Sequence, residues 1–341
     1  MRALCYTCGE GLGFFEMEKP KIVRDDDVLI RIAYVGICGS DINIIRGYED
    51  KFLGLEPGMR IILGHEAVGI VEEVGKGATV KGLKIGDRVA LYFNEYCGKC
   101  HFCRNGQEQF CTNKIDRMGS MADYVTRGEQ QVFKLDEEIS LLDAALVEPI
   151  SVVMRGMDLV GLKPGSTLAI SGGGGIGLLF TQIARHYGAS RITVIEPVAQ
   201  KRETALALGA DYAIDPFHED VVSRGKEITQ GRGFDVVIEC SGVRSTIQTS
   251  YDILSRGGVL ELFAAYPKGS EYSLNLASFF EKEAKIVGVF QSPYMYPRAL
   301  EMLKRLDTQP FTQNVYKVDQ WKEAFDARMT GVPQKVIMDF T

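Results

Sequence analysis

The sequence predicts a two-domain α/β protein, in which a β-rich, barrel-like domain is followed by a doubly wound parallel sheet. Three observations support this prediction. Residues 1–150 alternate short apolar runs with glycine turns and show little helix periodicity, which is typical of an antiparallel barrel. From Pro164 onward, apolar strand-like runs alternate with helical segments, which is typical of a parallel sheet. A run of glycines, Gly172–Gly177, separates the first strand of this region from its first helix.

The composition is that of a soluble globular protein. The chain has 341 residues, 45% of them hydrophobic and 25% charged, which is enough for two domains. A net charge of −6 without basic clusters argues against a nucleic-acid partner. The N-terminus lacks the apolar core of a signal peptide, and no apolar run is long enough to cross a bilayer. Eight cysteines in such a chain suggest metal binding, and a cytoplasmic location is expected.

The first domain is expected to consist mostly of strands separated by glycine turns. Asp25, Asp26 and Asp27 are interpreted as the turn between the first two strands. The expected strands are Ala3–Tyr6, Val28–Ile32, Ile61–Leu63, Val68–Val74, Asp87–Phe93, Gly119–Val125 and Gln131–Leu135.

Four cysteines, Cys97, Cys100, Cys103 and Cys111, follow in the spacing C-x2-C-x2-C-x7-C. Four thiolates this close in sequence can surround one tetrahedral zinc ion, and a closed shell of four sulfurs leaves no position for substrate. An iron–sulfur cluster is the chemical alternative. Ferredoxins, however, place the fourth cysteine three residues after the third, with a proline after it, whereas Thr112 follows here. Four unrelated buried thiols are the other alternative, and the spacing favours a structural zinc site.

Two further stretches of this domain contain side chains that can bind a metal. Cys38 lies between glycines in Gly36–Asp41 and, taken alone, is best interpreted as a small buried residue. His65 and Glu66 follow an apolar run that is expected to form a strand. Neighbouring residues on a regular strand point to opposite faces, so both can bind one ion only if the backbone turns there. Otherwise Glu66 is expected to orient His65 or a bound water.

Glu148 follows a predicted helix, Leu141–Leu146, and directly precedes Pro149. A proline disfavours helical backbone at the residue before it, so this place is interpreted as a helix boundary. By this context alone, Glu148 is expected to be a surface carboxylate.

The second domain is expected to span residues 151–290, and residues 291–341 to return to the first domain, at residues 1–150. The expected strands of the second domain are Ser166–Ser171, Arg191–Ile195, Tyr212–Ile214, Asp235–Cys240, Val259–Ala264 and Ile286–Phe290, and its expected helices are Leu178–Tyr187, Gln200–Leu208, Asp220–Thr229 and Ile247–Leu254. The C-terminal segment is expected to contain helices near Arg298–Leu306 and Gln320–Met329 and a strand at Lys335–Phe340.

A G-x-G-x-x-G motif is weak evidence by itself, but here it follows a strand, opens a helix and precedes an acidic residue at the end of the next strand. Glycines at these places make a tight turn and let backbone N–H groups approach a pyrophosphate. Glu196 can accept hydrogen bonds from a ribose diol and would repel a 2′-phosphate, so NAD is favoured over NADP. Lys201 and Arg202 nearby weaken this preference. The residues expected to contact the dinucleotide are Gly172, Gly174, Gly175, Ile176, Gly177, Glu196 and Lys201.

These landmarks, in this order, resemble the zinc-containing medium-chain alcohol dehydrogenase superfamily over essentially the whole chain. The closer resemblance is to its polyol branch, the sorbitol dehydrogenase-like enzymes. It implies a GroES-like catalytic domain, a Rossmann domain, one catalytic and one structural zinc ion, and NAD. The stretches that carry it are Gly36–Asp41, Gly64–Ala67, the four cysteines, Glu148-Pro149, Gly172–Gly177 and Glu239–Gly242.

The resemblance also assigns roles to residues. It makes Cys38 and His65 ligands of the catalytic zinc, and Glu66 or Glu148 the third protein ligand, since family members differ in this respect. Ser40 matches the hydroxyl that hydrogen-bonds the substrate and passes its proton outward. The Glu239–Gly242 stretch places Ser241 and Gly242 at the cofactor.

Two positions depart from the family pattern. Asn43 stands where a histidine usually ends the proton relay, and Gln291 stands where sorbitol dehydrogenases have an arginine.

The resemblance to the polyol branch implies oxidation of a polyol, sugar alcohol or cyclitol. The alternatives are threonine 3-dehydrogenase-like oxidation of an amino alcohol and a non-catalytic zinc- or NAD-binding relative. The expected partners are a small alcohol substrate and further copies of the chain in a homodimer or homotetramer, with no nucleic acid and no membrane.

Overall fold

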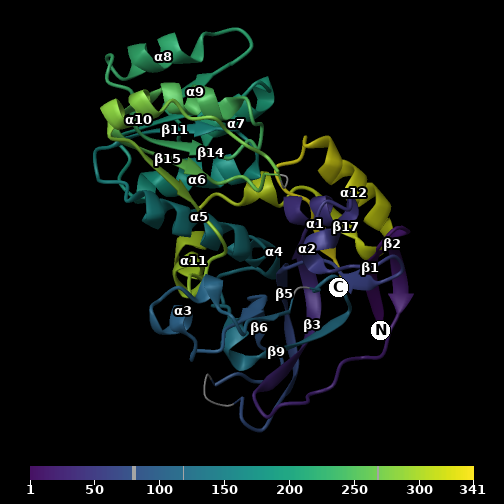
Figure 1. The fold of residues 1–341 in the computed structure, drawn as a ribbon. Helices are drawn as coiled ribbons and strands as arrows, with labels where there is room; N and C mark the ends of the chain where they lie inside the picture. The colour runs from purple at the N-terminus through teal and green to yellow at the C-terminus, as the bar shows by residue number, and fades with distance from the viewer. Residues whose placement is uncertain (79–81, 118, 267–268) are drawn as a thin grey trace. The chain divides into compact units, whose positions relative to one another are not determined.

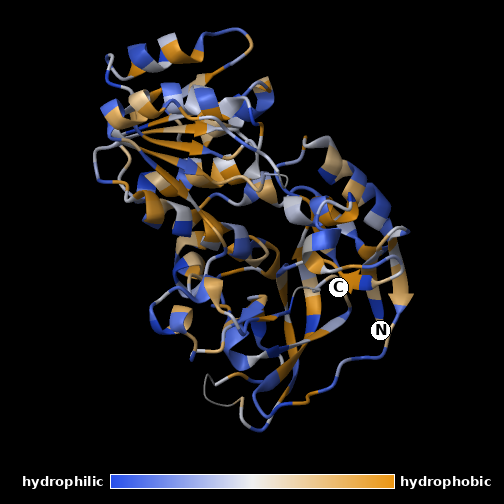
Figure 2. Ribbon diagram, viewed as in Figure 1, coloured by the Kyte–Doolittle hydropathy of each residue, from blue (hydrophilic) through white to orange (hydrophobic). Residues whose placement is uncertain are grey.

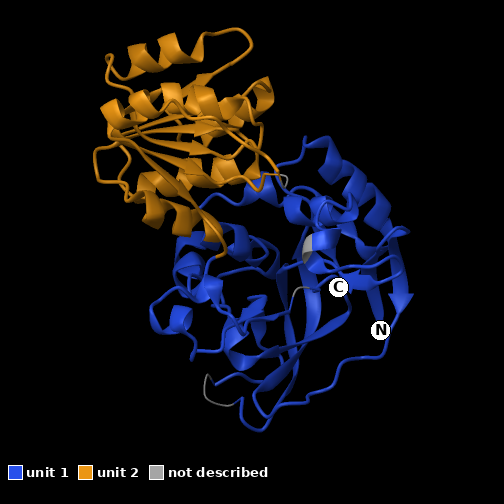
Figure 3. Ribbon diagram, viewed as in Figure 1, with its two compact units in different colours: residues 1–151, 292–341 blue, residues 152–291 orange. Residues whose placement is uncertain are grey.

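A computed structural model describes residues 1–78, 82–117, 119–266 and 269–341. The chain divides into two compact units (Figure 3). Unit 1 comprises residues 1–151 and 292–341, and unit 2 comprises residues 152–291. Among the described residues, no helix is both long and apolar enough to cross a membrane.

Unit 1 is built around a largely antiparallel seven-stranded sheet. Its strands follow the order β10-β6-β5-β3-β18-β17, with β9 also paired to β3. The strands are β3 (Asp27–Gly36), β5 (Glu66–Val74), β6 (Arg88–Leu91), β9 (Tyr124–Gly128), β10 (Val132–Lys134), β17 (Val315–Lys317) and β18 (Ile337–Asp339). β18, near the end of the chain, pairs antiparallel with β3.

Two smaller sheets complete the strands of unit 1. Their strands are β1 (Arg2–Thr7), β2 (Gly11–Glu16) and β4 (Arg60–Ile62) in one sheet, and β7 (Asn94–Glu95) and β8 (Ile115–Asp116) in the other. β2 was not predicted, and it lies between the two strands that were expected to be joined by the Asp25–Asp27 turn. The expected strand Gly119–Val125 is also displaced, because pairing with β3 begins only at Tyr124.

The helices of unit 1 are short and lie at the ends of the strands. They are α1 (Gly39–Ile45), α2 (Asp50–Leu53), α3 (His101–Arg104), α4 (Leu141–Ala144), α11 (Tyr296–Leu303) and α12 (Trp321–Thr330), with 3-10 turns at Glu108–Phe110, Glu129–Gln131, Gln309–Phe311 and Val318–Gln320. The core of this unit contains apolar side chains from β1, β3, β5, β6 and β18, and α12 packs against it through Ala324 and Phe325.

The chain passes from unit 1 to unit 2 within α5 (Val147–Val160). The sequence analysis did not predict this helix and ended the preceding one where α5 begins. Pro149 is compatible with helix here because it lies in the first turn, where its missing N–H has no intrahelical partner.

Unit 2 is a six-stranded parallel sheet in the order β13-β12-β11-β14-β15-β16. Its strands are β11 (Thr167–Ser171), β12 (Arg191–Ile195), β13 (Tyr212–Ile214), β14 (Phe234–Glu239), β15 (Leu254–Leu262) and β16 (Lys285–Gly288). These strands are strongly apolar (Figure 2), and every residue of β11 is buried. Such runs are expected of a parallel sheet that is covered on both faces.

Helices lie on both faces of this sheet (Figure 1). They are α6 (Gly175–His186), α7 (Ala199–Ala207), α8 (Val221–Ile228), α9 (Thr246–Asp252) and α10 (Leu276–Lys282). Val221, Ile228 and Tyr251 pack with Val237 and Leu260 in the core. α10 was not predicted, and β15 begins at Leu254, which had been assigned to the preceding helix.

Candidate functional site

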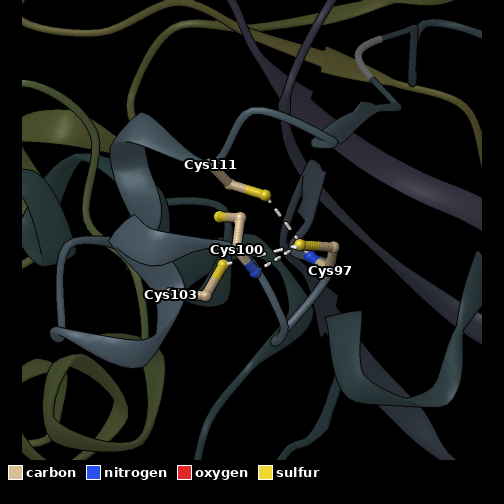
Figure 4. A group of neighbouring side chains, drawn as sticks. All are labelled: Cys97, Cys100, Cys103 and Cys111. Atoms are coloured by element: carbon tan, nitrogen blue, oxygen red, sulfur yellow. Dashed lines mark hydrogen bonds between the residues drawn. The ribbon is translucent and has the colours of Figure 1, made fainter.

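The side chains of four cysteines in unit 1 converge on one point (Figure 4). This group, the cysteine knuckle, consists of Cys97, Cys100, Cys103 and Cys111. Their sulfur atoms all lie within 4.8 Å of one another, and all four thiols are free. A zinc ion about 2.3 Å from each sulfur would hold the sulfurs about 3.8 Å apart. The observed group therefore needs only a small contraction to form a tetrahedral shell.

Backbone N–H groups point at these sulfurs. Those of Lys99 and Cys100 donate to Cys97 Sγ at 3.4 Å each, and the N–H of Cys97 donates to Cys111 Sγ at 3.5 Å. The first two bonds lower the pKa of the Cys97 thiol, and the N–H of Cys103 lowers the pKa of Cys100 to about 6. Since zinc binds thiolates, this donor set fits a structural zinc ion.

A second group of potential ligands lies elsewhere in unit 1. Ligand atoms of Cys38, His65 and Glu66 lie within 4.8 Å of one another, and His65 and Glu66 are buried. The backbone turns directly before His65, where Gly64 has a φ of +86°. His65 is outside the strands, and Glu66 is the first residue of β5. The two side chains therefore reach one site, which neighbours within a regular strand would not.

Asp41 joins the two loops that carry these ligands, a role that the sequence analysis missed. It is fully buried, and its carboxylate accepts the N–H of Cys38 at 2.8 Å and the N–H of Gly64 at 3.1 Å. Its position at the end of the Gly36–Asp41 motif was the available signal. Because both bonds are to backbone, Asp41 fixes the ligand loops independently of a metal.

Acidic side chains and a thiol lie around His65. Burial lowers its pKa, but the nearby Cys38, Asp41 and Glu148 side chains outweigh burial and raise the pKa well above the usual range. Its Nδ1 is buried and has no hydrogen-bond partner among the described residues. The ring packs edge-on against Phe93, with the centroids 5.2 Å apart. A buried imidazole amid negative groups is suited to a cation, and this donor set fits zinc.

The structure corrects the interpretation of Glu148 as a surface carboxylate. Glu148 lies in the first turn of α5 and is only 7% exposed. Burial raises the pKa of this carboxyl to about 7. It lies outside the ligand group of Cys38, His65 and Glu66, although its charge acts on His65. Of the two carboxylates proposed as third ligand, Glu66 is thus the one already grouped with Cys38 and His65.

Lys335, which the sequence analysis did not consider, forms an ion pair with Glu66. Lys335 precedes β18, and its side chain is 11% exposed. The pair packs tightly against Gly36, where a Cβ atom would collide with both side chains. The returning C-terminal segment therefore supplies a counter-charge to the ligand group.

Ser40 lies on α1, two residues after Cys38. Its Oγ is buried and has no hydrogen-bond partner among the described residues, so it can take up a hydrogen bond from a ligand. Asn43 follows three residues later on the same helix and is partly buried. Gln291, the other departure from the family pattern, has a φ of +59° and a buried Oε1 without a partner among the described residues.

The glycine loop of unit 2 has the geometry of a pyrophosphate cradle. Gly172 has a φ of +107°, and a Cβ atom on Gly177 would collide with the carbonyl oxygen of Gly172. α6 begins at Gly175, and no side chain caps it. Its first N–H groups therefore lack intrahelical partners and can bind a phosphate. Gly174 is the N-cap residue, and Ile176 lies in the first turn.

Glu196 follows β12 and is 6% exposed. Its carboxylate accepts the N–H of Gly173 at 2.7 Å and the N–H of Val198 at 3.0 Å, so it is fixed beside the glycine loop. Lys201 lies in the first turn of α7, directly beyond.

Ser241 and Gly242 follow shortly after β14, which is the strand that pairs with β11 in the sheet. The backbone of Ser241 lies against Gly172, where a Cβ atom would come within 3.0 Å of its N and Cα atoms. The predicted cofactor residues of unit 2 thus lie at the carboxyl ends of neighbouring strands of the sheet. α/β sheets bind ligands at these ends.

Two family models match the chain. The alcohol dehydrogenase GroES-like domain matches residues 24–137, and the zinc-binding dehydrogenase model matches residues 175–305. Sorbitol dehydrogenase of Bacillus subtilis is 32% identical over 89% of this chain and 87% of its own length. L-threonine 3-dehydrogenase of Pyrococcus horikoshii is 33% identical over 96% and 95%. A zinc-binding dehydrogenase of Sinorhizobium meliloti, solved with NADP bound, has a TM-score of 0.90, 28% identity, and coverage of 99% and 98%.

Proposed function

The chain belongs to the zinc-containing medium-chain alcohol dehydrogenase superfamily, and from this premise we propose that it oxidises a secondary alcohol of a polyol, sugar alcohol or cyclitol with NAD. The observation that carries the proposal is the group of Cys38, His65 and Glu66, in which His65 and Glu66 are buried. One thiolate, one imidazole and one carboxylate are three protein ligands, which is the number that leaves a catalytic zinc ion one open position.

Oxidation of an alcohol removes a hydride from carbon and a proton from oxygen. Zinc bound to these ligands supplies a Lewis acid, which makes that proton more acidic. The unpartnered Ser40 hydroxyl is the chain's own group for accepting the hydrogen bond of the substrate hydroxyl. Asn43 cannot accept this proton near neutral pH. We therefore propose that the proton leaves through water or the cofactor ribose.

We propose Glu66 as the third ligand and Glu148 as the carboxylate that orients a bound water or substrate hydroxyl. The grouping of Glu66 with Cys38 and His65 supports its role as a ligand. The raised pKa of Glu148 supports the second role, because a protonated carboxyl can also donate a hydrogen bond.

We propose NAD rather than NADP because of the charges next to the glycine loop. Glu196 would face a 2′-phosphate with a carboxylate. Arg202, one of the two nearby cations, is already engaged, since it donates to the carbonyl oxygens of Glu196 and Pro197 and forms an ion pair with Asp215 at 2.9 Å. The NADP in the Sinorhizobium structure makes this preference a matter for direct measurement.

The substrate assay is NAD reduction, followed by absorbance, with linear polyols, cyclitols, aminocyclitols and threonine. We expect activity with one polyol group that a zinc chelator abolishes. The Cys38→Ser variant should be inactive, while Cys5→Ser, which changes a buried thiol outside both ligand groups, should keep activity. Activity with threonine alone would favour the amino alcohol alternative, which the threonine 3-dehydrogenase relatives support. No turnover by a zinc-containing protein would favour the non-catalytic relative.

We also propose that the protein forms a homodimer or homotetramer. In support, β16 is an edge strand of the unit 2 sheet. α10 exposes Leu276 (75%) and Phe280 (85%), which lie four residues apart on one side of the helix. Unpaired edges and exposed apolar residues favour self-association. Sedimentation of the wild type and of Phe280→Glu tests this, and a monomeric wild type would contradict it.

A further inference from the structure

Glu239 is a fully buried carboxylate at the end of β14 that has no cationic partner among the described residues. Its Oε1 accepts the N–H of Ser241 at 3.0 Å, the hydroxyl of Ser241, and the hydroxyl of Thr246 at 2.9 Å. Its Oε2 accepts the hydroxyl of Tyr266. In each of these contacts Glu239 is the acceptor, so its two carboxyl oxygens are held by one backbone N–H group and three hydroxyl groups.

These bonds tie together two loops that are separate in the sequence. Ser241 and Thr246 belong to the connection after β14, whereas Tyr266 belongs to the connection after β15. The main-chain oxygen of Glu239 also binds the start of the second loop, because it accepts hydrogen bonds from the N–H groups of Phe263 at 2.9 Å and Ala264 at 3.3 Å. The Tyr266 hydroxyl is thus the side-chain contact that holds the second loop against the end of β14 itself.

Both loops leave the edge of the sheet at which the other cofactor residues lie. The strand order reverses between β11 and β14, which is the switch point where doubly wound sheets bind dinucleotides. Glu196 follows β12 and the glycine loop follows β11. A dinucleotide with its ribose at Glu196 and its pyrophosphate on α6 must therefore extend its other half over the ends of β14 and β15.

We propose that Tyr266, held in place through Glu239, is a positioning residue for the nicotinamide half of the cofactor. This rests on the proposed function, since it assumes that a nicotinamide dinucleotide binds at the glycine loop. The physical reason is that an anchored loop costs less conformational entropy when the cofactor orders it.

Calorimetric titration of the zinc-loaded protein with NAD and with ADP-ribose tests the proposal. ADP-ribose contains the adenosine and pyrophosphate groups but no nicotinamide. Loss of the hydrogen bond to Glu239 in Tyr266→Phe should weaken NAD binding about tenfold. Binding of ADP-ribose should change less than about twofold. Glu239→Gln, which keeps the shape but replaces one acceptor oxygen with a donor NH2 group, should shift NAD binding in the same direction.

Tyr272→Phe is the matched control. Tyr272 lies in the same connection as Tyr266, but its hydroxyl donates to Gln248, at 2.8 Å, instead of to Glu239. This variant should bind both ligands like the wild type. With turnover, Tyr266→Phe should raise KM for NAD more than it lowers kcat.

Three outcomes would overturn the reasoning in distinguishable ways. Unchanged NAD binding in Tyr266→Phe would show that the contact does not position the cofactor. An equal loss of NAD and ADP-ribose binding, with a lower unfolding temperature, would show a structural role only. If the wild type bound neither NAD nor ADP-ribose, the proposed function itself would fail, and this inference with it.

Discussion

Glu261 offers a quantitative test of how the fold controls protonation. It lies on β15, is fully buried, and neither of its carboxyl oxygens has a hydrogen-bond partner among the described residues. It packs against Gly156 of α5, where a Cβ atom would meet the carboxyl group. Burial raises its pKa from 4.5 to about 8. At neutral pH the carboxyl is therefore protonated in the folded protein and ionised in the unfolded chain.

The sign of the pH dependence follows from these two pKa values. Below pH 4.5 both states hold the proton, and the group contributes no pH dependence. Between pH 4.5 and about 8 only the unfolded chain releases it, so the free energy of unfolding falls as the pH rises. The slope is about 1.4 kcal/mol per pH unit. This amounts to about 2 kcal/mol between pH 6 and pH 8, since the slope falls as the folded-state carboxyl begins to ionise, and to about 5 kcal/mol over the whole titration.

Urea unfolding of the wild type and of Glu261→Gln, at several pH values between 6 and 8.5, measures this effect. The neutral amide cannot ionise, so the stability of the variant relative to the wild type should grow by about 2 kcal/mol from pH 6 to pH 8. Taking the difference cancels the contributions of other titrating groups. Glu281→Gln, on the exposed face of α10, should show no such growth. Parallel stability curves for Glu261→Gln and the wild type would refute the reasoning.

Three further predictions concern the metal groups and the cofactor. Cys97→Ser should reduce the zinc content by one ion per chain, measured by elemental analysis, and should lower the unfolding temperature, because a structural zinc ion contributes directly to folding. In the zinc-free protein, Lys335→Met should lower the free energy of unfolding by about 3 kcal/mol, because it leaves Glu66 buried without a counter-charge, whereas Lys335→Arg should restore most of it. Unchanged stability of Lys335→Met in urea would contradict the ion pair. Glu196→Gln should raise the ratio of kcat/KM for NADP to that for NAD by about tenfold, because it removes the charge facing the 2′-phosphate, and an unchanged ratio would remove the basis for NAD preference.

The parts of the site that sequence patterns predicted are those formed by neighbouring residues. The four cysteines of the knuckle lie within 15 residues of one another, and their spacing was sufficient to predict their convergence. The glycine loop is likewise a local turn between one strand and one helix, so its geometry follows from the residues that form it.

The misses have a common physical cause. β2 and α10 are short elements that depend on tertiary partners, and α5 continues through a proline that local rules associate with a helix end. Glu148 was misjudged from its local context for the same reason, since burial depends on what packs around a residue.

The sequence by itself predicted the fold class, the grouping of the four cysteines, the glycine loop and the family, because each depends on local spacing or on the alternation of strands and helices. Only the tertiary structure decided that Asp41 holds the loops of Cys38 and His65, and that Lys335 reaches Glu66 from a distant part of the chain. It alone also decided that Glu239 ties Tyr266 to the end of β14. Contacts of this kind form when strand pairing brings remote segments together, and burial then sets their charge.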